Sequence, residues 1–123
     1  MSDVQPGFVV AERLVGAITV VELHGELDIV AKTRITDRLE SLARAPRPDL
    51  VLDLRQVTFI DCCGLSILCR VRSRAARSGG RLRLVSCAPA FRRLLRLTSL
   101  TGDFELFDDL TSAIAQQPND AIV

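Results

Sequence analysis

The chain has 123 residues, 48% hydrophobic and 25% charged, which is typical of one soluble globular domain and excludes general disorder. Its 16 basic and 15 acidic residues leave a net charge of +1, so the sum gives no reason to expect a protein that coats nucleic acid or a membrane surface. The sequence has no signal-peptide pattern and no apolar run of membrane-spanning length, which predicts a cytoplasmic protein without membrane contact.

The N-terminal third predicts a hairpin followed by a helix. Residues 8–14 and the β-branched run 17–23 are expected to pair across a short turn at Val15-Gly16. The segment Gly25 to Asp28 is expected to end the second strand. Apolar residues at helical spacing then predict a helix over residues 29–43, with Asp28 as its cap or the residue before the cap, and two prolines after its end.

The rest of the chain alternates strands with helices. Strands are predicted at residues 50–54, 82–85 and 104–107, and helices at 62–78, 89–97 and from about 110 to 117, with residues 55–60 as a connection. The resulting order, β-β-α-β-α-β-α-β-α, predicts an α/β fold with a single mixed four- to five-stranded sheet and about four helices. We expect one domain over residues 8–117 and a frayed tail over residues 118–123.

The most informative segment is residues 50–68, where an acidic residue directly precedes a helix. Asp61 is predicted to be the N-cap, accepting a hydrogen bond from the amide of Cys63 or Gly64. The amides that follow form a positive helix end suited to an anion. Gly64 has two explanations: it leaves room for the backbone of a partner, or it fits tight packing within the chain.

Three segments together resemble the STAS domain family, in particular the bacterial anti-sigma-factor antagonists. Asp61-Cys62-Cys63-Gly64-Leu65 is similar to the family's Asp-Ser-Ser/Thr-Gly-Leu signature, and Gly25-Glu26-Leu27-Asp28 to its Gly-Glu-Leu-Asp element. Residues 88–95, with the Leu-Thr-Ser-Leu turn at 97–100, resemble its penultimate helix. The resemblance implies the STAS fold and a role in transcription regulation by partner switching.

The resemblance also implies a partner and a contact surface. Antagonists of this family bind an anti-sigma factor, often a kinase with a histidine-kinase-like ATPase fold, and so free a sigma factor. The implied partner-binding residues lie at the start of the helix and in the loop at the same end of the sheet: Asp28, Asp61, Cys62, Cys63, Gly64 and Leu65. The implied assembly is a one-to-one complex of a monomer or weak homodimer.

The chain departs from the family at the phosphorylated residue. The kinase modifies the serine directly after the aspartate, and Cys62 stands at that phospho-acceptor position. We therefore predict that this position is not phosphorylated and that binding is either constitutive or regulated in another way. Cys62 and Cys63 could form a thiol-based redox sensor, or cysteine could be a quiet substitute of about serine's size. A third possibility is a STAS module that scaffolds a larger complex.

Other chemistry finds little support in the sequence. Asp53 and Asp61 have no accompanying base or metal ligand, the four cysteines show no zinc spacing, and there is one histidine. We expect no enzyme activity, metal or cofactor. Cys69 and Cys87 are expected to be small core residues.

The arginines are unevenly distributed. Residues 70–96 contain nine arginines and no acidic residue, so this segment carries +9 and the remainder −8. The run is a solvated face, an electropositive surface for an acidic partner, or a nucleic-acid site. The last lacks both aromatic side chains for stacking and a reading motif.

Overall fold

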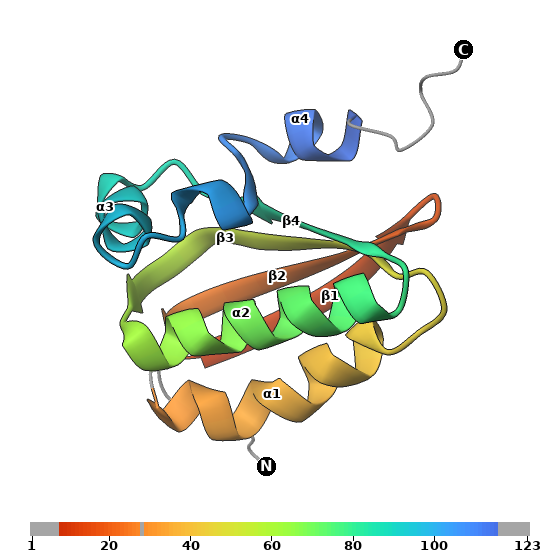
Figure 1. Ribbon diagram of the computed structural model, residues 1–123, viewed down its shortest axis with the longest axis horizontal. Coiled ribbons are helices and arrows are strands. Elements are labelled where there is room, and N and C mark those ends of the chain that lie inside the picture. Colours follow the sequence, from red (N-terminus) through yellow and green to blue (C-terminus); the bar gives the residue numbers. More distant parts are fainter. Residues whose placement is uncertain (1–7, 28, 116–123) are drawn as a thin grey trace.

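The computed structural model describes residues 8–27 and 29–115 and contains a five-stranded sheet in the spatial order β1-β2-β3-β4-β5 (Figure 1). The strands are β1 (Phe8–Val15), β2 (Ile18–Leu27), β3 (Asp49–Ile60), β4 (Arg81–Val85) and β5 (Glu105–Phe107). β1 pairs with β2 in the antiparallel sense, and all the other neighbours are parallel. The predicted mixed sheet and element order are confirmed.

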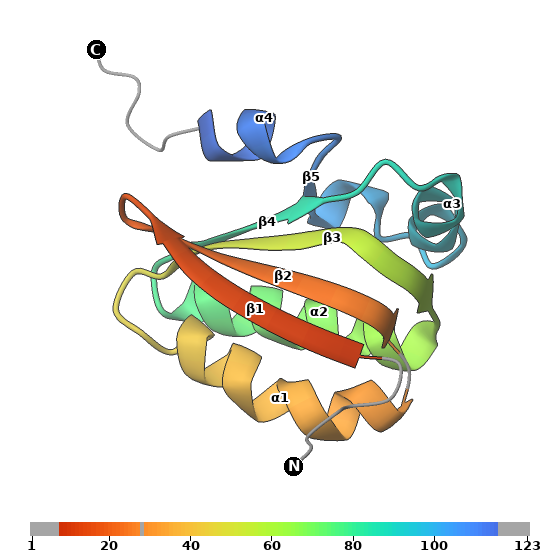
Figure 2. The same ribbon diagram turned by 180° about the vertical axis from the view of Figure 1, so that it is seen from behind.

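Within the described residues, four α-helices and a short 3₁₀ helix surround this sheet. They are α1 (Ile29–Ala43), α2 (Cys62–Arg77), α3 (Pro89–Leu97), the 3₁₀ helix η1 (Thr101–Asp103) and α4 (Leu110–Ala115). Figures 1 and 2 show α1 and α2 side by side on one face of the sheet and α4 on the opposite face. α3 lies beyond the end of β4, beside the last part of β3. No helix within the described residues has the length and apolar character needed to span a bilayer.

The two faces of the sheet bury cores of unequal size. The larger core joins α1 and α2 to the sheet and includes Leu39, Leu52 and Leu68, each with no exposed surface. The smaller one packs α4 on the other face through residues such as Val51 and Ala113. Because β3 is covered on both sides, its first half is an almost continuous apolar run, as expected for a buried parallel strand.

The structure corrects two predicted strand ends. β2 does not end near residue 23 but continues to Leu27, with Gly25 at a φ of 97°, a value that favours glycine. The predicted connection 55–60 is wrong, because these residues form the second half of β3. Between the pairs Glu22–Asp53 and Leu27–Ile60 the register shifts twice, leaving two extra residues in β3. Such β-bulges bend a strand and redirect its side chains.

The length of β3 positions the start of α2. β4 pairs with β3 only as far as Asp53, so residues 54–60 extend past β4 and, within the described part of the chain, pair only with β2. The strand therefore carries Asp61 to the margin of the sheet. Here α2 begins beside the end of β2, and α3 stands next to the strand's open edge.

Candidate functional site

The start of α2 is fixed by hydrogen bonds to and from Asp61. The residue has extended backbone angles (φ −115°, ψ −167°), and its Oδ1 accepts a hydrogen bond from the Gly64 amide at 3.0 Å. Its own amide donates to the Leu27 carbonyl at 3.4 Å, and its carbonyl accepts from Leu65 at 2.9 Å. The predicted N-cap is confirmed, and it joins the start of α2 to the end of β2.

The packing around Gly64 shows why this position holds glycine. Gly64 is buried, and a Cβ atom added there would lie 2.3 Å from the Leu27 carbonyl oxygen and 2.9 Å from Cγ1 of Ile60. Side chains do not tolerate such distances. Of the two explanations, tight packing within the chain accounts for the glycine, because the space a partner's backbone would need is already filled.

Exposure divides the predicted partner-binding residues into two groups. Cys62 is exposed, whereas Asp61 and Cys63 are partly exposed. Gly64 is buried, and Leu65, which is 4% exposed, packs in the larger core. The sixth predicted residue, Asp28, lies outside the described residues. The surface offered by this helix start is therefore made of the residues from 61 to 63.

The cysteines differ in their surroundings. All four are free thiols. Cys69 packs against the larger core, as predicted, and burial raises the pKa of its thiol. The prediction that Cys87 is a core residue is wrong: it is exposed, because it follows the last residues of β4 at the turn into α3. Cys62 and Cys87 are thus the two exposed thiols, and Cys63 is partly exposed.

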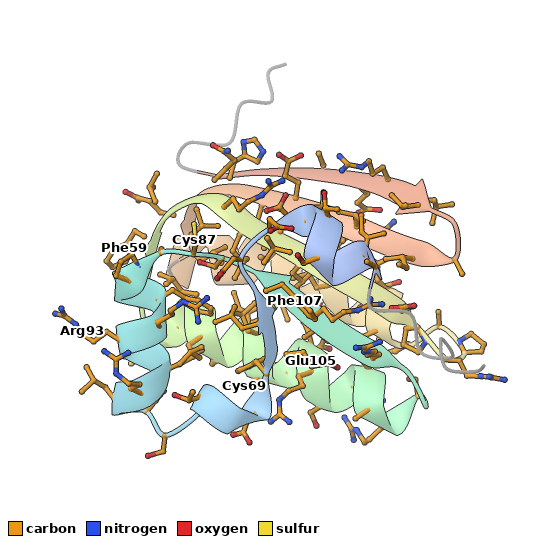
Figure 3. The ribbon with its side chains drawn as sticks, turned by 90° about the horizontal axis from the view of Figure 1, so that it is seen from above. Phe59, Cys69, Cys87, Arg93, Glu105 and Phe107 are labelled. Carbon is orange, nitrogen blue, oxygen red and sulfur yellow. The ribbon has the colours of Figure 1, made fainter. Side chains whose placement is uncertain are left out.

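Sequence reasoning missed an exposed aromatic side chain next to the helix start. Phe59 is 50% exposed although it lies near the end of β3. It follows the second register shift in that strand, at the pair with Glu26. Figure 3 shows Phe59 on the side of the molecule where α3 lies. Sequence alone gave no signal for this exposure, because it depends on the pairing of β3 and on where β4 stops.

Acidic residues from outside the arginine-rich segment neutralise part of its charge. Four of its nine arginines form such ion pairs: Arg70–Glu40, Arg81–Glu105, Arg83–Asp49 and Arg92–Asp108. Arg72 lies over the ring of Phe104 at 5.3 Å, a cation–π contact. No acidic partner among the described residues contacts Arg72 or the remaining four arginines: Arg74 and Arg77 on α2, and Arg93 and Arg96 on α3.

Asp53 makes a local ion pair. Its two carboxylate oxygens accept from the Arg55 side chain at 2.9 and 2.7 Å, and its Oδ1 also accepts from the Arg55 amide. Burial raises the pKa of Asp53, but the hydrogen bonds from Arg55 outweigh it and leave the pKa below its usual value. The ion pair with Arg55, two residues further along β3, keeps the Asp53 carboxylate charged. We therefore assign Asp53 a structural role.

Comparison with known proteins identifies the family. Residues 9–113 match the STAS domain, so the chain belongs to the STAS domain family. The sequence is similar to a STAS-domain containing protein of Pseudomonas aeruginosa, with 28% identity over 86 residues that cover 70% of this chain and 84% of the relative. It is also similar to the anti-sigma-B factor antagonist of Bacillus subtilis, with 28% identity over 88 residues, or 72% and 77% of the two chains.

A solved structure shows the same architecture. The crystal structure of an anti-sigma factor antagonist from Mycobacterium paratuberculosis superposes with a TM-score of 0.79 at 28% sequence identity, covering 89% of this chain and 94% of that one. The five-stranded mixed sheet and its four helices are therefore those of a STAS-fold antagonist.

Proposed function

We propose that this protein is an anti-sigma-factor antagonist that regulates transcription by partner switching. The observation that carries the proposal is the Asp61-capped, solvent-facing start of α2, which lies inside a STAS domain similar to two named antagonists. The proposed domain is residues 8–117 and the proposed activity is binding, without catalysis. The partner is an anti-sigma factor, which in this family often has a histidine-kinase-like ATPase fold.

The contact surface is centred on the residues from 61 to 63. Asp61 holds the first turn in place, and the exposed Cys62 side chain projects from it. Gly64 and Leu65 act from within by setting how closely this turn packs on the end of β2. Asp28 is proposed to contribute from the neighbouring loop.

The mode of regulation follows from the thiol at position 62. A serine kinase transfers phosphate to a hydroxyl, and Cys62 offers none. The Ser66 hydroxyl already makes a hydrogen bond within the helix, since it donates to the Cys63 carbonyl at 2.7 Å. The helix start is therefore proposed to stay unphosphorylated when the anti-sigma factor and ATP are present.

The binding test is recovery of the native anti-sigma factor by the full chain, followed by calorimetry with the purified pair. Cys62→Asp adds a negative charge at the exposed first turn, a position where helices accept acidic residues, and is expected to weaken binding at least tenfold. Cys87→Asp adds the same charge at another exposed cysteine and should bind like the wild type. Equal affinity of both variants would place the contact surface elsewhere.

The phosphorylation test uses the anti-sigma factor with ATP, read by mass spectrometry. The wild type should gain no phosphate on the α2 start, whereas Cys62→Ser should gain one if the partner is a kinase. Phosphate on the wild-type helix start would refute the proposed regulation. Peroxide treatment tests the redox alternative. If the protein is a thiol sensor, oxidation should weaken the binding of the wild type to the anti-sigma factor and leave the binding of Cys62→Ser unchanged.

A further inference from the structure

A polar hollow of about 180 Å³ lies between α1 and α2, the two helices that lie side by side on one face of the sheet (Figure 1). Its lining consists of Glu40 from α1 and Arg70, Ser73, Arg74 and Arg77 from α2. Three arginines against one glutamate give this lining a net charge of +2. Because arginine makes its strongest hydrogen bonds to carboxylates and phosphates, the hollow favours an anionic group.

The glutamate does not neutralise the arginines at this hollow. Glu40 Oε2 accepts a hydrogen bond from Arg70 Nε at 2.8 Å, and Glu40 Oε1 accepts from Arg44 at 3.5 Å. Arg74 and Arg77 have no acidic partner within the residues that the structure describes. Arg74 is partly exposed and Arg77 is exposed. Because each guanidinium carries five N–H donors, both side chains keep donors for an incoming acceptor.

The three arginines form a row along α2. Arg70, Arg74 and Arg77 are spaced i, i+4 and i+7, which places them on one face of the helix over about 10 Å. Since arginine binds a carboxylate through two parallel hydrogen bonds, a second helix with carboxylates at the same spacing matches this row charge for charge. Arg74 and Arg77 also offset the negative C-terminal end of α2, but that role does not use their hydrogen-bond donors.

A second copy of this chain offers no acidic row to match. Most carboxylates in the described part of the chain form ion pairs or cap helices. The exceptions are Glu26, Asp37 and Asp103, which lie on β2, α1 and η1. Among the described residues that line the hollow, none is an apolar side chain that would enter a bilayer or an aromatic ring on which a base would stack. The lining therefore fits an acidic segment of a different protein.

We propose that this hollow, the α1–α2 arginine site, docks an acidic helix of a second protein. Two carboxylates of that helix accept hydrogen bonds from Arg74 and Arg77, and a third lies beside Arg70. Cys62 and Arg77, the first and last residues of α2, are about 22 Å apart along the helix axis. The site therefore lies away from the proposed antagonist surface and goes beyond that function, so failure of one proposal leaves the other standing.

The test is a titration of the full ¹⁵N-labelled chain with a helical peptide, followed by amide chemical shifts. The probe is an alanine-based peptide of about 18 residues with glutamates at i, i+4, i+7 and i+11. Saturable shifts are expected in residues 70–77, with a dissociation constant on the order of 1 mM at about 50 mM salt, because exposed ion pairs are weak. No saturable shift up to about 5 mM peptide would overturn the proposal.

Two control peptides separate the row from general attraction between charges. Glutamine at the four glutamate positions keeps the shape of the peptide without its charge and should weaken binding at least about tenfold. Four glutamates distributed around the helix keep the charge without the row and should weaken binding about threefold or more. Equal binding of the two acidic peptides would overturn the assignment of a helix with carboxylates on one face.

Variants of the chain locate the site. Arg74→Gln and Arg77→Gln each remove one unpaired charge and should weaken binding of the acidic peptide about threefold, as one exposed ion pair allows. Arg93→Gln removes the same charge from α3 and should leave the affinity unchanged. Equal losses for Arg77→Gln and Arg93→Gln would overturn the site, since binding would then follow net charge alone. Binding to a DNA duplex or to phosphatidylserine vesicles that is tighter than peptide binding and lost in Arg77→Gln would overturn the choice of a protein partner.

Discussion

Replacing Gly64 with alanine tests the close contact between α2 and the end of β2. Within a helix, alanine is favoured over glycine by about 1 kcal/mol, so local propensity alone predicts a more stable protein. The added Cβ, however, would lie 2.3 Å from the Leu27 carbonyl oxygen and 2.9 Å from both Leu27 Cβ and Ile60 Cγ1. Since the nearest of these atoms is backbone, the helix start must move. Overpacking of this kind costs about 1–3 kcal/mol or more, and we expect the clash to prevail.

Urea unfolding of the full chain, followed by circular dichroism, measures the result. Gly64→Ala should lower the free energy of unfolding by about 1–3 kcal/mol with little change in the denaturant slope. Gly102→Ala is the matched control, because no atom lies within 4 Å of a Cβ built at that glycine. It should stay within about 0.5 kcal/mol of the wild type. A Gly64→Ala protein about 1 kcal/mol more stable than the wild type would refute the close contact.

Three further changes test the charged groups. Asp61→Ala should cost about 1 kcal/mol in unfolding free energy through loss of the cap and Asp61→Asn much less, since asparagine caps equally well. Asp53→Asn should be destabilising near pH 7; because the folded pKa of Asp53 lies below its unfolded value, this difference should shrink as acid titration protonates the wild-type carboxylate. Arg83→Met removes a fully buried guanidinium from Asp49 and should lower the unfolding free energy by about 3–5 kcal/mol. Arg81→Met, at a more exposed pair, should lower it by about 0–1 kcal/mol. Urea titrations across pH check all three, and equal losses for the two arginine variants would contradict the last.

Features set by local chemistry were predictable from the sequence. The helices Ile29–Ala43 and Pro89–Leu97 were predicted with the observed boundaries, because apolar spacing, prolines and glycines act within a few residues. The cap of α2 was predictable for the same reason, since the Asp61 carboxylate bonds an amide three residues away.

Features set by distant segments were not predictable. Residues 55–60 read as a connection, but β2 provides a pairing partner that makes them strand. The burial of Gly64 depends on Leu27 and Ile60, and the exposure of Phe59 depends on where β4 stops. Each needs a contact between elements that the chain brings together only on folding.

The distribution of charge shows the same limit and bears on partner recognition. The segment 70–96 carries +9 and the rest of the chain −8, which suggests a molecule with one strongly positive side. Instead, its ion pairs cross the boundary between the two regions: Arg70 on α2 bonds Glu40 on α1, and Arg83 on β4 bonds Asp49 on β3. Part of the separated charge, four of the nine arginines, therefore joins neighbouring elements. Electrostatic steering of an acidic partner must therefore depend on the unpaired arginines, which lie on the two helices α2 and α3.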